Sequence, residues 1–326
     1  MDTCIEASQR DQDTWLSDPC RIGESGERVS HLHRSHFFYA HLSLYDFAAP
    51  LCKGAVVLDA GSGAGYGAAH LADAGAEHVL GIDISDRAVE FSKHHFQRDN
   101  LDFRLMSVER VADLLSQRFD VIFSSNTLEH VPNVMGFLRG AWSLLKPGGV
   151  LVVAVPPITD DRLLYLNLIN AHHINLWSPR QWSFVLSQFF QEVSPYLHGV
   201  QRIGEDFQPE HAGTHSGLTE KDFVIERGTV EDMYDRFTLT AIFVARGPRP
   251  QSRVSSAARL PQFVDGSFTR EPGHIDPNLR KRLKGYFEPQ EAPQSLFARA
   301  FHVLRSRGAL ALGREVATFA RRRLHL

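Results

Sequence analysis

The chain has 326 residues, of which 43% are hydrophobic and 22% charged, an ordinary composition for a folded protein with a sizeable core. The net charge of −3 conceals an uneven distribution, because residues 249–326 hold 15 Lys and Arg against 6 Asp and Glu. Three cysteines without a C-x-x-C spacing favour neither a disulfide framework nor a zinc site. The sequence shows no signal-peptide pattern and no apolar run of about 18 residues that could span a bilayer, so we expect a cytoplasmic protein.

Apolar periodicity predicts the elements of one large domain. Residues 1–26 show no clear period and are predicted to be a poorly ordered lead-in, followed by a helix over residues 29–49 that ends at Pro50. Short apolar runs then alternate with amphipathic stretches. The runs predict strands over residues 55–60, 78–83, 101–106, 119–124 and 150–155, and the stretches predict helices over residues 65–75, 86–98, 108–117 and 134–145.

The alternation changes after residue 157. Residues 158–178 are too long for a simple connection and are predicted to form a lid or insertion. A helix over residues 179–188 and strands near 192–197 and 237–245 then complete the sheet. The predicted fold class is α/β: a doubly wound, mostly parallel, seven-stranded Rossmann-like sheet in a domain over residues 27–247, with an N-terminal helical cap.

The C-terminal part has a different composition. Residues 248–294 are rich in Pro, Gln, Ser and Arg and are predicted to be a linker. Residues 295–326 are predicted to be a basic amphipathic helical tail, in which Phe297, Phe301 and Leu304 share a stripe among arginines. Such a tail can bind the surface of an anionic membrane, or it can pack on the protein body or on a second subunit. A peripheral membrane location and an oligomer therefore both stay open.

The segment 56–67, Val-Val-Leu-Asp-Ala-Gly-Ser-Gly-Ala-Gly-Tyr-Gly, joins a predicted strand to a helix through a glycine-rich turn. Glycine lets such a turn approach a ligand closely. The candidate binding residues in this turn are Gly61, Ser62, Gly63 and Gly65. The glycine spacing alone also suits a dinucleotide. Asp59 argues against one, because a carboxylate at the strand end repels a pyrophosphate but attracts ammonium and sulfonium groups. The sequence therefore favours S-adenosylmethionine as the cofactor.

A second acid supports this assignment. Asp83 ends the second predicted strand, 24 residues after Asp59. An acid at that place accepts hydrogen bonds from the ribose hydroxyls in nucleotide-binding folds. Either acid alone is as well explained by a helix cap or a turn, whereas the pair at this spacing favours the cofactor.

Five segments in this order resemble class I S-adenosylmethionine-dependent methyltransferases of the small-molecule type. They are the turn 59–65, Gly-Ile-Asp-Ile-Ser at 81–85, Phe-Asp-Val-Ile at 119–122, Leu-Glu-His-Val at 128–131 and Leu-Lys-Pro-Gly-Gly at 145–149. The resemblance covers residues 55–157. The segment 54–59, which follows the His- and Arg-rich residues 31–34, is similar to bacterial members that are associated with glycosyltransferases.

The resemblance implies further contacts with the cofactor. Ile84 and Asn126 are counted among the candidate cofactor-binding residues. The third strand of family members usually ends in an acid that binds the adenine amine. This chain has Ser107 there, so the Ser107 side chain and the Val108 backbone are expected to serve instead, with Glu109 as a further candidate. In some quinone-pathway relatives an E-x-x-E-H run helps to hold a divalent metal. Here Asn126 replaces the first Glu, and no metal is predicted.

Methyl transfer from a sulfonium is an in-line displacement, so the enzyme supplies alignment and, for a hydroxyl acceptor, a base. The candidate catalytic residues are Glu129 and His130, which follow the fourth predicted strand, and His173 in the predicted lid. Glu129 and His130 are explained equally well as residues that fix the following loop. Trp177 or Trp182 would offer a flat face on which a sugar ring stacks, unless Trp177 packs in the core.

These observations predict S-adenosylmethionine-dependent methylation of a hydroxyl on a sugar or glycoconjugate. Two alternatives stay open: O-methylation of a quinone-type or other small aromatic acceptor, and a non-catalytic S-adenosylmethionine-binding partner subunit. A nucleic-acid substrate is not expected, because the predicted catalytic domain is acidic and no N/D-P-P-Y/F motif follows the fourth strand.

Overall fold

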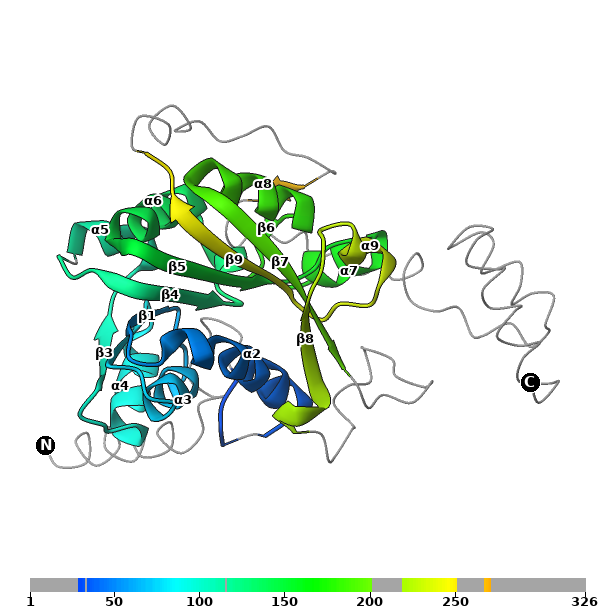
Figure 1. Cartoon of the computed structure of the whole chain (residues 1–326). Coiled ribbons are helices and arrows are strands. Elements are labelled where there is room, and N and C mark those ends of the chain that lie inside the picture. Colours follow the sequence, from blue (N-terminus) through cyan, green and yellow to red (C-terminus); the bar gives the residue numbers. More distant parts are fainter. Residues whose placement is uncertain (1–28, 33, 115, 201–218, 251–266, 271–326) are drawn as a thin grey trace, which may run out of the picture. The chain divides into compact units, whose positions relative to one another are not determined.

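The computed structural model describes residues 29–32, 34–114, 116–200, 219–250 and 267–270 (Figure 1). The chain divides into two compact units, Met1–His274 and Ile275–Leu326, and every described residue belongs to the first. The predicted lead-in 1–26 and the predicted tail 295–326 lie outside the described residues. The membrane and subunit contacts expected of the tail therefore stay predictions.

Eight strands form one mixed sheet in the order β3-β2-β1-β4-β5-β9-β7-β8. Their bounds are β1 Val56–Ala60, β2 His78–Asp83, β3 Leu101–Leu105, β4 Phe119–Ser125, β5 Leu145–Val155, β7 Phe190–Val200, β8 Phe223–Arg227 and β9 Ala241–Pro248. The strands from β3 to β5 are parallel, whereas β9, β7 and β8 run antiparallel to their neighbours. The predicted doubly wound, mostly parallel α/β fold is confirmed.

The sheet has one strand more than the seven predicted. The additional strand is β8, which pairs with β7 at the edge of the sheet. Its sequence, Phe-Val-Ile-Glu-Arg, contains only three apolar residues, and these are half-buried while the two charged residues are exposed. An edge strand buries little apolar surface, so its apolar run is short. Apolar periodicity alone does not distinguish such a short run from a loop.

The helices begin and end near the predicted places, with some differences. Their bounds are α2 His36–Cys52, α3 Tyr66–Asp73, α4 Asp86–His95, α5 Val111–Leu114, α6 Val134–Leu144, α7 Asp161–Leu168, α8 Pro179–Phe189 and α9 Asp232–Asp235. The first helix starts after Ser35, whose hydroxyl accepts the Phe38 N–H as the N-cap. It then continues through Pro50, so the expectation that Pro50 ends it was wrong. A proline in the last turn removes one hydrogen bond without breaking the helix before it.

The predicted helix over residues 108–117 is also shorter than expected. A 3-10 turn, η2 (Val108–Arg110), leads into the single turn of α5. A second 3-10 turn, η3 (Leu128–His130), follows β4 and carries two of the candidate catalytic residues.

Helices cover both faces of the sheet: α2, α3 and α4 lie on one face, and α5, α6 and α8 lie on the other (Figure 1). Successive strand residues point to opposite faces. Val57 belongs to the same buried cluster as Leu71 of α3, whereas Leu58 belongs to the cluster of Phe137 in α6. Each face of the sheet packs its own set of side chains against its helices. A slip by one residue would turn each set to the opposite face, so this packing fixes the register of the strands. The carboxyl ends of the parallel strands are thereby held at one edge, where α/β folds bind ligands.

The predicted lid, residues 158–178, contains α7 and the short strand β6 (Asn175–Leu176). Strand β6 pairs antiparallel with β10 (Phe268–Thr269), which comes from the predicted linker. At least these residues of the segment 248–294 therefore belong to the folded unit, although the predicted domain boundaries as a whole stay predictions. Among the described helices, none is both long enough and apolar enough to cross a membrane.

Candidate active site

The turn after β1 has the shape that its glycines allow. Gly61 and Ser62 both donate their backbone N–H to the Ile82 carbonyl of β2, at 2.9 Å. Gly61 has φ +89°, and a Cβ there would lie 2.2 Å from the Thr127 hydroxyl oxygen, so no side chain fits. Gly65, with φ +78°, is the N-cap of α3. The predicted cofactor turn therefore packs directly against the segment that links β4 to η3.

Asp83 ties this turn to the end of β2. One carboxylate oxygen accepts the Gly63 N–H and the other accepts the Ser85 N–H, each at 2.9 Å. Beside Gly63 the space is open, since a Cβ built there meets no atom within 4 Å. The next side chain, Ile84, is apolar but 72% exposed. The Asp83 carboxylate suits the hydroxyls of a ribose, and the exposed Ile84 side chain suits the flat face of the attached base.

The turn also contains an unsatisfied polar atom. The Ser62 hydroxyl oxygen is buried and has no hydrogen-bond partner among the described residues. Buried hydroxyls usually have a partner, so a polar group of a bound ligand fits this position. Together with the open space at Gly63, this observation shows that the turn suits S-adenosylmethionine.

Asp59 lies fully buried at the end of β1. Its carboxylate accepts a hydrogen bond from the Tyr45 hydroxyl of α2 at 3.3 Å. Burial raises the pKa of Asp59 to about 7; the Asp83 charge adds to this effect, and the Tyr45 hydroxyl opposes it. A carboxylate in such surroundings gains from a nearby cation, which agrees with the expected ammonium or sulfonium partner.

The predicted adenine contacts follow β3. The Ser107 hydroxyl accepts the Glu109 N–H and lies 3.4 Å from a Glu109 carboxylate oxygen, so it caps η2. The other Glu109 oxygen accepts the Asn133 N–H at 2.6 Å. These two side chains therefore have structural roles. Val108 is buried, and the contact of its backbone with adenine stays a prediction.

Asn126 follows β4 in a left-handed backbone conformation, with φ +47°. Such a conformation costs a non-glycine residue on the order of 1 kcal/mol and is often found at functional sites. Its side-chain amide lies 3.3 Å from His41 Nε2 and donates to the Ser125 hydroxyl. The described contacts of Asn126 thus connect it to α2. Its contact with the cofactor stays a prediction.

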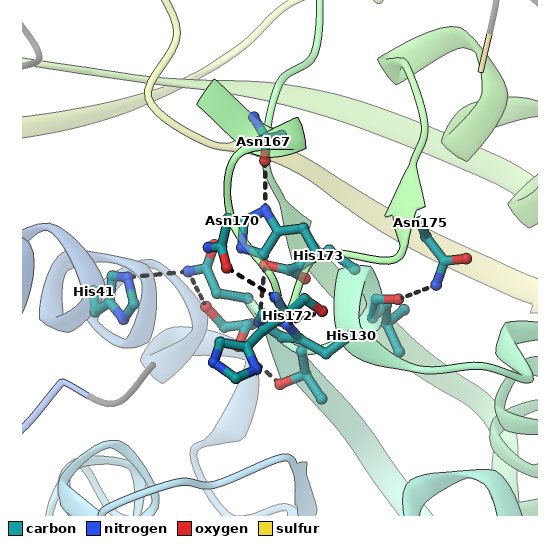
Figure 2. A network of polar contacts seen from close by, with 12 residues as sticks. His41, His130, Asn167, Asn170, His172, His173 and Asn175 are labelled. Carbon is teal, nitrogen blue, oxygen red and sulfur yellow. Dashed lines mark hydrogen bonds and ion pairs between the residues drawn. The ribbon is translucent and has the colours of Figure 1, made fainter. Parts of the chain in front are cut away.

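His41 is a site residue that the sequence analysis missed. It lies on α2 and points toward the strand ends (Figure 2). Burial lowers the pKa of His41 to about 4, so the ring is neutral at physiological pH. The only signal in the sequence is a polar residue between Phe38 and Leu42 on a helix that is otherwise apolar there.

The three candidate catalytic residues come together. Glu129 is 2% exposed, and its carboxylate lies 4.0 Å from His130 Nε2. The His130 and His173 rings meet edge to face with centroids 4.8 Å apart. Figure 2 shows both histidines at the strand ends, with His172 and Asn170 of the lid beside them. The structure thus joins η3 and the lid into one cluster, and the catalytic roles of these residues stay predictions.

Hydrogen bonds at Nδ1 fix the orientation of the His130 and His173 rings. His130 Nδ1 lies 2.9 Å from the His172 carbonyl, and His173 Nδ1 lies 2.6 Å from the Asn167 side-chain oxygen. Both partners are acceptors, since the Asn167 amide nitrogen donates to Leu163. Each Nδ1 therefore carries a proton, and in the neutral form of either ring the lone pair lies on Nε2. Burial, followed by the charges of His130 and Arg270, lowers the pKa of His173 to about 3.

The same cluster offers ligands to a metal ion. Glu129, His130 and His173 each contribute one ligand atom, and these atoms lie within 4.8 Å of one another. Two atoms bound to one ion at about 2.1 Å lie at most about 4.2 Å apart. The side chains would have to move closer to coordinate an ion, so the prediction of a site without metal stays a prediction.

The expectation about the two tryptophans can be compared with the structure. Trp177 and Trp182 are 2% and 1% exposed, and their rings pack on each other at 4.5 Å. The hypothesis that one of them offers a face to a sugar ring was wrong, because both faces lie in the core. His172 is exposed, and its carbonyl, which binds His130, is the part of it with a role in the cluster.

Known proteins are similar to this chain in the same part of the sequence. Residues 58–153 match a family model described as a methyltransferase domain. The ubiquinone biosynthesis O-methyltransferase of Methylocella silvestris is 32% identical over 147 residues, 44% of this chain and 56% of that protein. The protein of that name from Cereibacter sphaeroides strain ATCC 17029 is 31% identical over 173 residues, 50% of this chain and 69% of that protein. A solved S-adenosylmethionine-dependent methyltransferase from Archaeoglobus fulgidus, at 20% identity, has a TM-score of 0.47 over 64% of this chain and 93% of its own.

The chain spans 56% of the length of the Methylocella silvestris protein, and 59% and 51% of the proteins of the same name from Rhodopseudomonas palustris strain HaA2 and Mesorhizobium japonicum. The match to the Cereibacter sphaeroides protein is broader, with 69% of that protein covered at 31% identity. The expected association with glycosyltransferases stays a prediction. The glycine turn, its two acids and the matching domain all lie in the same part of the chain. The chain therefore belongs to the class I S-adenosylmethionine-dependent methyltransferases.

Proposed function

We propose that this protein transfers the methyl group of S-adenosylmethionine to a hydroxyl of a small aromatic acceptor of the quinone type. The observation that carries the proposal is the cluster of Glu129, His130 and His173, next to the segment that packs on the glycine turn. When bound, S-adenosylmethionine supplies a methyl group activated by its sulfonium. The protein has to align the acceptor oxygen with that methyl group and remove the hydroxyl proton.

His130 is the proposed base. Its Nδ1 donates a hydrogen bond to the His172 carbonyl, so Nε2 is the nitrogen that would take the hydroxyl proton. The Glu129 carboxylate, 4.0 Å from Nε2, favours the imidazolium that results. His173 is a weaker base, because its pKa is about 3. We assign it the orientation of the acceptor, through a hydrogen bond that a second, neighbouring hydroxyl of a catechol-type acceptor donates to Nε2.

Three observations support an aromatic acceptor over a sugar. The edge-to-face rings of His130 and His173 offer flat surfaces on which an aromatic ring can pack. Both tryptophans that would have stacked on a sugar are buried in the core. The curated relatives carry the name ubiquinone biosynthesis O-methyltransferase, which favours the same class of acceptor.

A direct assay compares acceptors with methyl-labelled S-adenosylmethionine. We expect label in 3,4-dihydroxybenzoate, a catechol probe, and none in methyl glucoside, with the catechol signal lost in His130→Ala. Label in the glycoside alone would overturn the acceptor class. Cofactor binding without transfer to any acceptor of the quinol, catechol or sugar classes would favour the non-catalytic alternative.

A further inference from the structure

Residues 267–270, here called the strap, lie against the lid although they follow it by about a quarter of the chain. Phe268 pairs with Leu176, and Thr269 pairs with Asn175. The Thr269 hydroxyl accepts the Trp177 indole N–H at 3.0 Å and donates to the Asn175 side-chain oxygen at 2.9 Å. The Ser267 hydroxyl accepts the Ser178 N–H at 2.8 Å. The strap is therefore bonded to the lid through both backbone and side chains.

Arg270 makes the most extensive of these contacts. Its guanidinium donates to three lid carbonyls: Nε to His173 at 2.7 Å, Nη1 to Leu168 at 2.9 Å, and Nη2 to Asn170. Leu168 is the last residue of α7, so the positive charge also lies at the negative end of that helix. The planar fork of a guanidinium holds several acceptors in a fixed arrangement, which the rotating ammonium of lysine does less well. The Arg270 guanidinium therefore fixes the lid backbone from Leu168 to His173.

The lid in turn holds the catalytic turn η3. The Asn175 side-chain amide donates to the Leu128 and Val131 carbonyls, each at 2.7 Å. The Ile174 N–H donates to the Glu129 carbonyl at 2.8 Å. Strand β6 is thus hydrogen-bonded to η3 on one side and to the strap on the other. Any displacement of β6 would move both histidines.

We propose that the strap is part of the acceptor site and that Arg270 is a positioning residue for methyl transfer. Arg270 acts through the lid backbone, which sets the place of His173 and, through β6, the place of Glu129 and His130. The inference rests on the proposed function, since the reaction that it tunes is the methyl transfer. The cofactor turn makes no described contact with the strap, so the effect is specific to the acceptor half of the site.

The test uses the full chain with Arg270→Ala, Arg270→Lys and the matched control Arg249→Ala. Arg249 also donates to two backbone carbonyls, those of Ser187 and Phe190, but at the end of β9 away from the lid. With the catechol probe, we expect Arg270→Ala to lower kcat at least tenfold while the Kd for S-adenosylmethionine stays within twofold. Arg270→Lys recovers part of kcat, and Arg249→Ala keeps the wild-type value. Equal losses in Arg270→Ala and Arg249→Ala, or a kcat for Arg270→Ala within twofold of wild type, would overturn the proposal.

A second readout separates this inference from the proposed function. Hydrogen exchange followed by mass spectrometry needs no acceptor. We expect Arg270→Ala to speed amide exchange in residues 161–176, with the glycine turn unchanged, whereas Arg249→Ala leaves the lid protected. If wild-type protein methylates no probe but the lid responds in this way, the proposed acceptor is wrong and the positioning contact stands. Unchanged exchange in the lid of Arg270→Ala overturns the inference even if the enzyme is active.

Discussion

The cofactor half and the acceptor half of the site are built in different ways. The cofactor half takes its turn from residues 59–65 and its second acid from Asp83, and backbone hydrogen bonds join the two. The acceptor half takes His41 from α2, Glu129 and His130 from η3, His173 from the lid, and its support from Arg270. A site made from one compact stretch leaves a motif in the sequence. A site assembled from four separate segments leaves only single residues.

The two halves also differ in electrostatics. The cofactor half has two neighbouring acids, and burial, together with the Asp83 charge, raises the pKa of Asp59. In the acceptor half burial lowers the pKa of His41 and of His173, and the Arg270 guanidinium is hydrogen-bonded to backbone carbonyls. The first environment suits a cationic ligand, and the second suits a neutral hydroxyl that must lose a proton. If the halves work as described, variants should affect one half and leave the other intact.

The largest expected effect is on the acceptor half. His130→Ala should lower kcat by roughly 100-fold or more, because general-base help is lost, with the Kd for S-adenosylmethionine nearly unchanged. Steady-state kinetics and calorimetry measure the two quantities. His172→Ala is the matched control, since it keeps the carbonyl that binds His130 Nδ1 and should stay near wild type. If His173→Ala gives the large loss and His130→Ala does not, the two roles are exchanged.

Asp59→Asn should separate function from stability in the cofactor half. The folded pKa of about 7 lies above the ordinary value of 3.8, so the fold favours the protonated acid. That contribution is fully present below pH 3.8 and is lost as the pH rises through about 7. The neutral amide should therefore raise the Tm of the free protein by at least about 3 °C at pH 8 and by little at pH 4.

The same change should weaken S-adenosylmethionine binding by about tenfold, since the carboxylate that attracts the cation is gone. Wild-type affinity should in turn rise with pH up to about 7, as the free acid loses its proton. Thermal melts and titrations at several pH values check both statements. A variant that is more stable and binds the cofactor as well as wild type would mean that Asp59 does not face the ligand.

Removal of metal should have a small effect. Since the ligand atoms of Glu129, His130 and His173 spread over 4.8 Å, we expect EDTA to change turnover by less than twofold. The measurement is the rate before and after chelation, with Mg²⁺ and Zn²⁺ added back separately. Loss of activity with EDTA and its recovery with one of these ions would show that the cluster closes around a metal.

The smallest effect on turnover is expected from the basic tail. The full chain should float with anionic vesicles at low salt and be released as the ionic strength rises, while a chain that ends at His274 should not float. The shorter chain keeps the strap and should keep its kcat with a soluble acceptor. Equal flotation of the two chains would exclude the membrane role.

The central strands and the cofactor turn could be predicted because their signals are local. Buried parallel strands read as apolar runs, and the Gly61 and Gly65 conformations tolerate hardly any other residue. Contacts between distant segments gave no such signal. Nothing near Arg270 distinguishes it from the other basic residues of a Pro- and Arg-rich stretch. The sequence also left the role of Trp177 open. Whether a tryptophan is buried depends on which segments pack around it, and the sequence near Trp177 does not show this.

The pairing of Asp83 with the glycine turn tests the account most directly. Calorimetry should give a clear heat of binding when S-adenosylmethionine is titrated into the wild-type protein. Asp83→Ala should raise the Kd about tenfold or more, since hydrogen bonds to a charged group are lost. Asp102→Ala, which removes an exposed acid on the neighbouring strand, should bind as wild type does. No heat with the wild-type protein, or an unchanged Kd in Asp83→Ala, would contradict the assignment of this turn to S-adenosylmethionine.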